Sequence, residues 1–126
     1  MTRRLASASG TYSDAVAVAG PGTWVHIAGQ LGVQMDGAGS DRPRAEQARI
    51  ALLRIEQLLG EMDASLSDVV KVTVFVTDFD DYAEVSRVRN AVFGDLRPAS
   101  TAVQVAGLLA GAAIEIEALA FVADSG

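Results

Sequence analysis

The chain has 126 residues, a net charge of −6 and no cysteine, which excludes a disulfide framework, a thiol nucleophile and a thiolate metal site. An acidic domain repels phosphate backbones, so nucleic-acid binding is not expected as a main role. No apolar run approaches the roughly 18 residues of a membrane span, and the basic N-terminus lacks the apolar stretch of a signal peptide. We expect one cytoplasmic domain over residues 1–126, with a loose polar segment at 1–11 and no membrane partner.

The N-terminal third of the chain is predicted to form strands separated by turns. Residues 12–19 and 24–29 predict two strands, joined by the turn Gly20-Pro21-Gly22. Residues 31–35 predict a third strand, which the glycine-rich segment 36–40 ends.

Two helices are predicted. The first begins at Ser40 or Asp41 and has an apolar stripe with helical spacing, made of Ala48, Leu52, Ile55, Leu59 and Met62. The second spans residues 82–93 and stops at Gly94. The acidic residues at 78–81 are predicted to cap it and to occupy its first turn, where the helix dipole attracts negative charge.

Three further strands are predicted at residues 69–77, 101–105 and 113–122. The resulting order of elements indicates an α+β fold in which two helices pack on one sheet. Each long strand has one apolar and one mixed face, because successive side chains alternate. We expect the apolar faces to meet the helices and the mixed faces, which include Ser100 and Glu115, to meet another subunit in a homo-oligomer.

Few residues indicate chemistry by themselves. His26 lies in an apolar strand with no second histidine or cysteine to share a metal, and it is predicted to be packed for structural reasons. No Gly-x-Ser-x-Gly elbow supports a Ser-His-Asp triad. Glu115 and Glu117 share one face of the last strand, either as an exposed edge or inter-subunit salt bridge, or as a carboxylate that orients water in an inter-subunit cleft.

Six segments of the chain together carry a family resemblance. They are Tyr12-Ser13-Asp14-Ala15-Val16, Ile27-Ala28-Gly29-Gln30-Leu31, Leu66-Ser67-Asp68-Val69-Val70-Lys71-Val72-Thr73-Val74-Phe75-Val76-Thr77-Asp78, Asp81-Tyr82-Ala83-Glu84-Val85, Pro98-Ala99-Ser100-Thr101 and Ile114-Glu115-Ile116-Glu117-Ala118. Their combination and order resemble the RidA/YjgF family over residues 12–122.

The resemblance implies a chorismate-mutase-like α+β fold with a mixed sheet, assembled as a homotrimer with three clefts between subunits. It implies hydrolysis of reactive enamines and imines, such as the tautomers of 2-aminoacrylate, to a 2-keto acid and ammonia without metal or cofactor. An arginine binds the substrate carboxylate, and a glutamate near the chain end positions the attacking water. Tyr12 matches the family's cleft tyrosine, Gly29 the glycine whose backbone borders the ligand, and Glu115 the water-positioning glutamate.

Three family residues are replaced in this chain. Ser100 stands where the Pro-Ala-Arg motif has its arginine, Ala102 replaces the cysteine two positions later, and Ser86 replaces an asparagine early in the second helix. The loop before Pro98 is also shorter than usual. A serine provides neither the charge nor the two-pronged geometry of a guanidinium. The loss is worth roughly 1.5–3 kcal/mol, on the order of ten- to a hundredfold in binding.

Three other arginines are candidates for the missing carboxylate contact. Arg97 adjoins Pro98, but neighbouring residues on an extended chain point to opposite faces. Arg54 and Arg89 stand at positions where family members often carry a smaller or neutral residue.

The sequence leaves two functions open. One is a divergent hydrolase of an enamine, imine or related small molecule, with weak or absent activity on 2-aminoacrylate. The alternative is a non-catalytic trimer that binds a metabolite or a partner protein, which the joint loss of arginine, cysteine and asparagine favours. Ribonuclease activity, attached to some relatives, fits least, because the chain is acidic and has no histidine pair.

Overall fold

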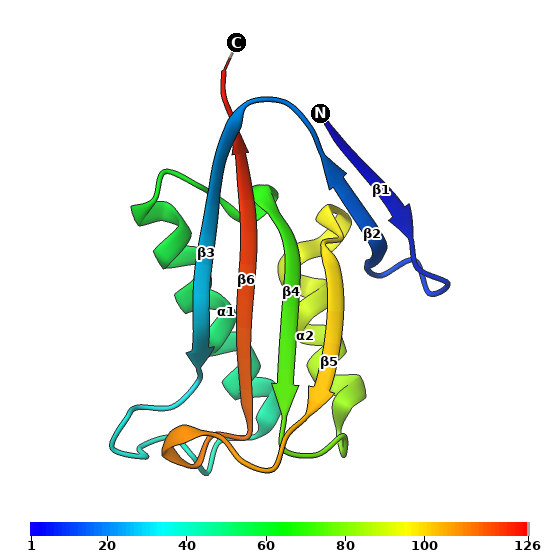
Figure 1. Cartoon of the computed structure of the whole chain (residues 1–126). Coiled ribbons are helices and arrows are strands. Elements are labelled where there is room, and N and C mark those ends of the chain that lie inside the picture. Colours follow the sequence, from blue (N-terminus) through cyan, green and yellow to red (C-terminus); the bar gives the residue numbers. More distant parts are fainter. Residues whose placement is uncertain (126) are drawn as a thin grey trace.

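A mixed sheet of six strands forms the centre of the computed structural model, which describes residues 1–125 (Figure 1). The strands lie in the order β1-β2-β5-β4-β6-β3, with β5 parallel to both β2 and β4 and the other neighbours antiparallel. Their bounds are Thr2–Ala6, Ser13–Val18, Gly22–Leu31, Val69–Val76, Ala99–Gln104 and Ile114–Ala123, in order from β1 to β6. The connections include α1 (Arg44–Glu61), α2 (Tyr82–Phe93) and short 3₁₀ helices at Leu66–Asp68, Gly94–Leu96 and Leu109–Gly111.

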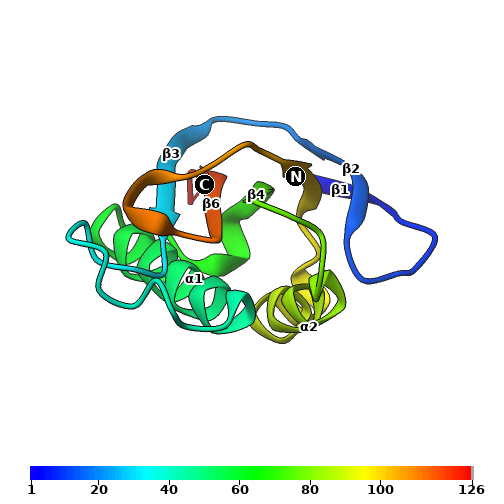
Figure 2. The same ribbon diagram turned by 90° about the horizontal axis from the view of Figure 1, so that it is seen from below.

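Both α-helices cover the same face of the sheet (Figure 2), and the core lies between the two layers. The buried side chains alternate along the central strands and follow the apolar stripe of α1; they include Leu52, Ile55, Leu59, Val72, Val74, Val76, Ile114 and Ile116. Full burial of one such side chain stabilises the fold by about 1.5–3 kcal/mol. The predicted fold class, two helices on one face of a mixed sheet, is confirmed.

The predicted elements at residues 82–93 and 69–77 match α2 and β4 to within one residue. The first helix begins later than predicted, at Arg44, because residues 37–42 form two successive turns and Pro43 has extended backbone. The third strand predicted at 31–35 is wrong. Instead β3 continues to Leu31, and the backbone then turns, with the Gln34 carbonyl accepting a hydrogen bond from Gly37.

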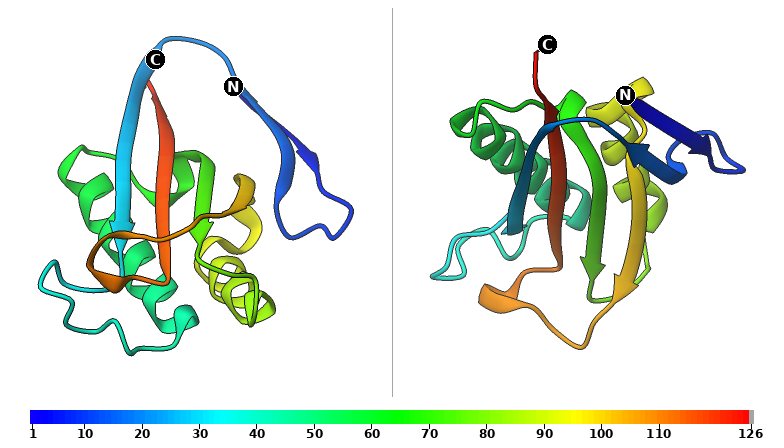
Figure 3. Two further views of the ribbon diagram at one scale, coloured as in Figure 1. Left: turned by 60° about the horizontal axis from the view of Figure 1, so that its bottom comes forward. Right: turned by 45° about the horizontal axis from the view of Figure 1, so that its top comes forward.

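The N-terminal segment is an ordered hairpin, so the prediction of a loose segment at 1–11 is wrong for β1. Strand β1 is exposed throughout but pairs with β2, and this hairpin diverges from the rest of the sheet (Figure 3). Ser13 joins the hairpin to the segment before β5. Its amide donates a hydrogen bond to the Pro98 carbonyl, and its hydroxyl donates one to the Arg97 carbonyl. The hairpin loop before Ser13 is therefore held beside α2 and β5.

The acidic segment before α2 binds an arginine rather than capping the helix, which corrects the prediction for residues 78–81. Asp81 occupies the N-cap position without a side-chain capping bond. Its carboxylate instead accepts a hydrogen bond from Arg44 at 2.7 Å, and Asp78 accepts another at 3.0 Å. Burial lowers the pKa of Arg44, but the bonds and charges of the two aspartates outweigh it and raise the pKa above its ordinary value.

Within residues 1–125, none of the helices combines the length and the apolar surface that crossing a bilayer requires. The cytoplasmic location stays a prediction.

Candidate functional site

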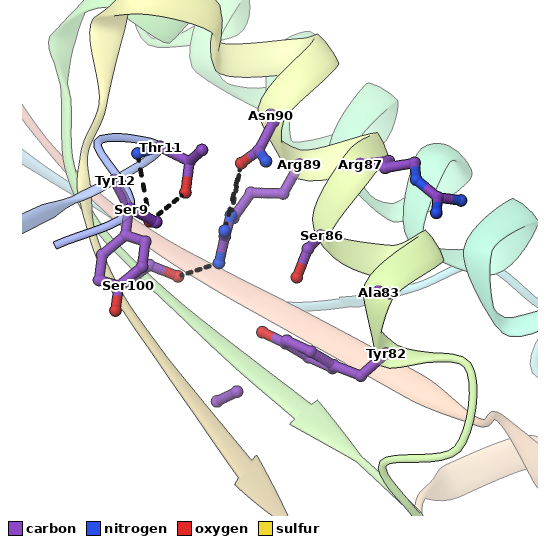
Figure 4. A pocket seen from close by; sticks show the side chains of 11 residues that line it. Ser9, Thr11, Tyr12, Tyr82, Ala83, Ser86, Arg87, Arg89, Asn90 and Ser100 are labelled. Carbon is purple, nitrogen blue, oxygen red and sulfur yellow. Dashed lines mark hydrogen bonds between the residues drawn. The ribbon is translucent and has the colours of Figure 1, made fainter. Parts of the chain in front are cut away.

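A cavity of about 610 Å³ lies between the hairpin loop, α2 and β5. Its wall includes one buried guanidinium, from Arg89, and several hydroxyl groups, from Ser9, Tyr12, Tyr82, Ser86 and Ser100 (Figure 4). Ala102 also borders it. The cavity therefore brings together four of the positions predicted for the site: Tyr12, Ser86, Ser100 and Ala102.

Arg89 occupies the centre of this wall, and its contacts fix the plane of its guanidinium. Its Nε and Nη2 both donate to the Asn90 side-chain oxygen at 3.2 Å, and its Nη1 donates to the Ser100 hydroxyl at 3.3 Å. Its Cζ lies 5.1 Å from the centre of the Tyr12 ring, a cation–π distance. A guanidinium from α2 thus reaches Ser100, the position at which the sequence resemblance predicts an arginine.

Ser100 lies on the helix side of the sheet, which corrects its assignment to the mixed face. It pairs with Val72 of β4, whose side chain is buried beneath the helices. Thr101 consequently lies on the open face, where its hydroxyl accepts a hydrogen bond from Lys71. We had expected only apolar side chains of β5 to face the helices. That expectation is wrong here because α2 presents an arginine, rather than an apolar side chain, to this part of β5.

Glu115 and Gly29 form a separate pair on the open face of the sheet. Glu115 pairs with Phe75 of β4, so its side chain points away from the helices. Strand β3 has a bulge between Ile27 and Gln30, and there a Cβ on Gly29 would overlap the Glu115 carboxylate. The absent side chain of Gly29 therefore provides the space in which the carboxylate lies. One chain does not bring Glu115 and Ser100 together, because they project from opposite faces.

The other candidate arginines point elsewhere. Arg97 has a left-handed backbone and extends toward Asp95, with 3.5 Å between the charged groups. Arg54 donates to the Leu31 carbonyl at 3.1 Å. Neither residue lines the cavity described above.

His26 is exposed rather than packed, which corrects the prediction of a packed structural residue. It lies on the open face and borders a second cavity of about 420 Å³ together with Lys71, Thr73 and Glu117. Within residues 1–125 no three metal-ligating side chains of His, Cys, Asp or Glu gather in one place.

The sequence prediction did not assign Ser9, Thr11, Tyr82 and Asn90 to the site, although they line the cavity. The spacing of Tyr82, Ser86, Arg89 and Asn90 at three to four residues was an available signal, because such residues share one face of a helix. Ser9 and Thr11 gave no signal, because their place depends on how the hairpin folds back.

This architecture defines a class of small α+β proteins in which two helices cover one face of a mixed sheet and a cavity lies between the second helix and the strand that follows it. Residues 1–122 match the family model described as Endoribonuclease L-PSP. The 2-iminobutanoate/2-iminopropanoate deaminase of Bos taurus is 37% identical over 121 residues, covering 94% of this chain and 85% of the relative. The chain belongs to the RidA/YjgF family.

Solved structures agree with this assignment. Rv2704 of Mycobacterium tuberculosis, a member of the YjgF/YER057c/UK114 family, is 38% identical with a TM-score of 0.69, covering 97% of this chain and 100% of the other. The structure of E. coli TdcF with bound serine is 29% identical with a TM-score of 0.72, covering 85% and 92% of the two chains.

Proposed function

We propose that the protein is a cofactor-free hydrolase of small imines or enamines that acts in clefts between the subunits of a homotrimer. The observation that carries the proposal is the Glu115 carboxylate seated over Gly29 on the open face of the sheet. The deaminase relatives, one of them 37% identical, support the same reaction class.

The proposed chemistry adds water across a carbon–nitrogen double bond. Glu115 orients the water and accepts its proton while the oxygen attacks the imine carbon. Glu115 returns this proton to the nitrogen, which gives the tetrahedral carbinolamine. Transfer of the hydroxyl proton to the nitrogen, again through Glu115, then expels ammonia and leaves a carbonyl group. An enamine first becomes the imine by taking a proton on carbon and losing one from nitrogen. Positioning of water and imine and proton transfer through Glu115 together account for the rate gain in this proposal.

A second subunit is needed in this proposal, because the two parts of the site lie on opposite faces of one sheet. The cavity with Tyr12 and Ser100 would come from one subunit, and Glu115 with Gly29 from its neighbour. The open face has the apolar content for such contact, with Trp24 and Val103 48% and 39% exposed. Large apolar side chains exposed on one sheet face are typical of an interface.

The proposed trimer predicts a sedimentation mass of about three times the 13.1 kDa chain at micromolar concentration. Val103→Asp places a charge on the open face and is expected to increase the monomer fraction. Leu53→Asp is the matched control, because Leu53 is 43% exposed on the helix layer. A natural chain that sediments as a monomer would exclude both the interface and the shared site.

The reaction itself is tested with imine generated freshly from an amino acid, by measuring release of ammonia and keto acid above the spontaneous rate. We expect the natural chain to accelerate this release in proportion to its concentration. A trimer that binds keto acids but leaves the release rate at the buffer value would favour the non-catalytic binding function instead.

A further inference from the structure

Arg89 differs from every other buried polar residue in the described part of the chain, because it carries a full charge. It is 9% exposed, and the others in this class are Ser7, Ser13 and Gln47. No carboxylate oxygen among residues 1–125 lies within 4.0 Å of its nitrogens. Removing a cation from water without a counter-charge is unfavourable, so this position is suited to an anion that comes from outside the chain.

The contacts of Arg89 leave part of its guanidinium free for such an anion. An arginine has five N–H groups, and three hydrogen bonds hold it to Asn90 and Ser100. Two N–H groups remain, which matches the two oxygens of one carboxylate. The Tyr12 ring and the Asn90 amide hold the plane in place, so little side-chain freedom is lost on binding.

The rest of the cavity favours a small monoanion. Its wall contains hydroxyl groups and the exposed Arg87, and no aspartate or glutamate borders it. A single buried guanidinium balances one carboxylate, whereas a phosphate dianion would leave excess negative charge, because the cavity's other buried donors are neutral and Arg87 is exposed to solvent. Figure 4 shows Ser86 and Tyr82 pointing their hydroxyls toward the space in front of Arg89.

We propose that Arg89 binds the carboxylate of a small 2-imino or 2-keto acid, replacing from helix α2 the arginine that Ser100 has displaced from β5. The inference rests on the proposed function and names its substrate class. It also reverses the expectation of weak activity on 2-aminoacrylate, because that expectation assumed that no arginine reaches the site.

The test measures binding of pyruvate, of its uncharged methyl ester and of inorganic phosphate by NMR chemical-shift titration. The natural chain is expected to bind pyruvate more tightly than the other two. Arg89→Gln is expected to weaken pyruvate binding about ten- to a hundredfold and to leave the ester unchanged. Arg97→Gln is the matched control, because Arg97 loses the same charge outside the cavity.

An exchange of positions separates the role of the charge from a structural role. Ser100→Arg alone places a second guanidinium against Arg89 and is expected to weaken pyruvate binding or destabilise the fold. Ser100→Arg together with Arg89→Gln returns the arginine to β5 and is expected to restore pyruvate binding to within a fewfold of the natural chain. This variant also decides the question if Arg89→Gln alone does not fold.

Several outcomes would overturn the inference. They are equal affinity of the natural chain for pyruvate and the ester, tighter binding of phosphate, a loss in Arg97→Gln as large as in Arg89→Gln, and failure of the exchange variant to bind pyruvate. The inference and the proposed function fail separately. If pyruvate binding depends on Arg89 but no imine is hydrolysed, the inference stands and the proposed function is wrong. If imine is hydrolysed equally well with and without Arg89, the inference is wrong and the proposed function stands.

Discussion

Glu115→Gln is expected to reduce the protein-dependent rate of imine hydrolysis by about 100- to 10,000-fold. The amide has the size of the carboxylate but cannot accept a proton from the attacking water. The same side chain lies on the open face with Gly29 beneath it, so the substitution needs no rearrangement of the strand. The measurement is kcat/KM for ammonia release, with sedimentation to establish that the variant keeps its assembly.

Two companion variants define the role of Glu115. Glu117→Gln removes the same charge two residues along the same face of β6 and is expected to change kcat/KM by less than about threefold, in line with ordinary surface substitutions. Gly29→Ala keeps the carboxylate but occupies its place, so it should lower kcat/KM without unfolding the protein. Full activity in Glu115→Gln, or equal losses in Glu115→Gln and Glu117→Gln, would show that another group directs the water.

Gln47→Leu is expected to lower the free energy of unfolding by about 2–5 kcal/mol. Gln47 is 0% exposed, and its amide group joins three parts of the chain. Its Nε2 donates to the Arg42 carbonyl at 2.9 Å, and its Oε1 accepts from the Ala113 amide at 2.9 Å. Leucine has nearly the same helix propensity, but it would remove both hydrogen bonds from these partly buried backbone groups. Chemical denaturation measures the loss.

The control for this prediction is Gln57→Leu, in the same helix α1 at an exposed position. It should change the free energy of unfolding by no more than about 0.5 kcal/mol.

Close packing at Gln47 extends to its backbone, because a Cβ on Gly32 would overlap the Gln47 backbone atoms. If Gln47→Leu is as stable as the natural chain, water has replaced the lost bonds and the amide is not needed for the fold.

The sequence by itself determined the local structure and the family. The spacing of Leu52, Ile55 and Leu59 defined α1, and the alternating valines defined β4, because these patterns depend only on residues close together in the chain. Gly94 ended α2 for the same reason. The family resemblance was confirmed by the comparisons, and it identified Tyr12, Gly29, Ser100 and Glu115 as positions of interest, whose roles stay predictions.

Only the tertiary structure decided how these positions are shared between the two faces of the sheet. The face that Ser100 occupies depends on its register with Val72 and on what α2 presents to it, and neither is encoded near residue 100. The hairpin that brings Tyr12 over Arg89 depends on contacts across more than 80 residues of chain, through Ser13 and Arg97. Long-range pairing of this kind fixed which of the three candidate arginines enters the cavity, because side-chain direction follows from packing against distant elements rather than from local spacing.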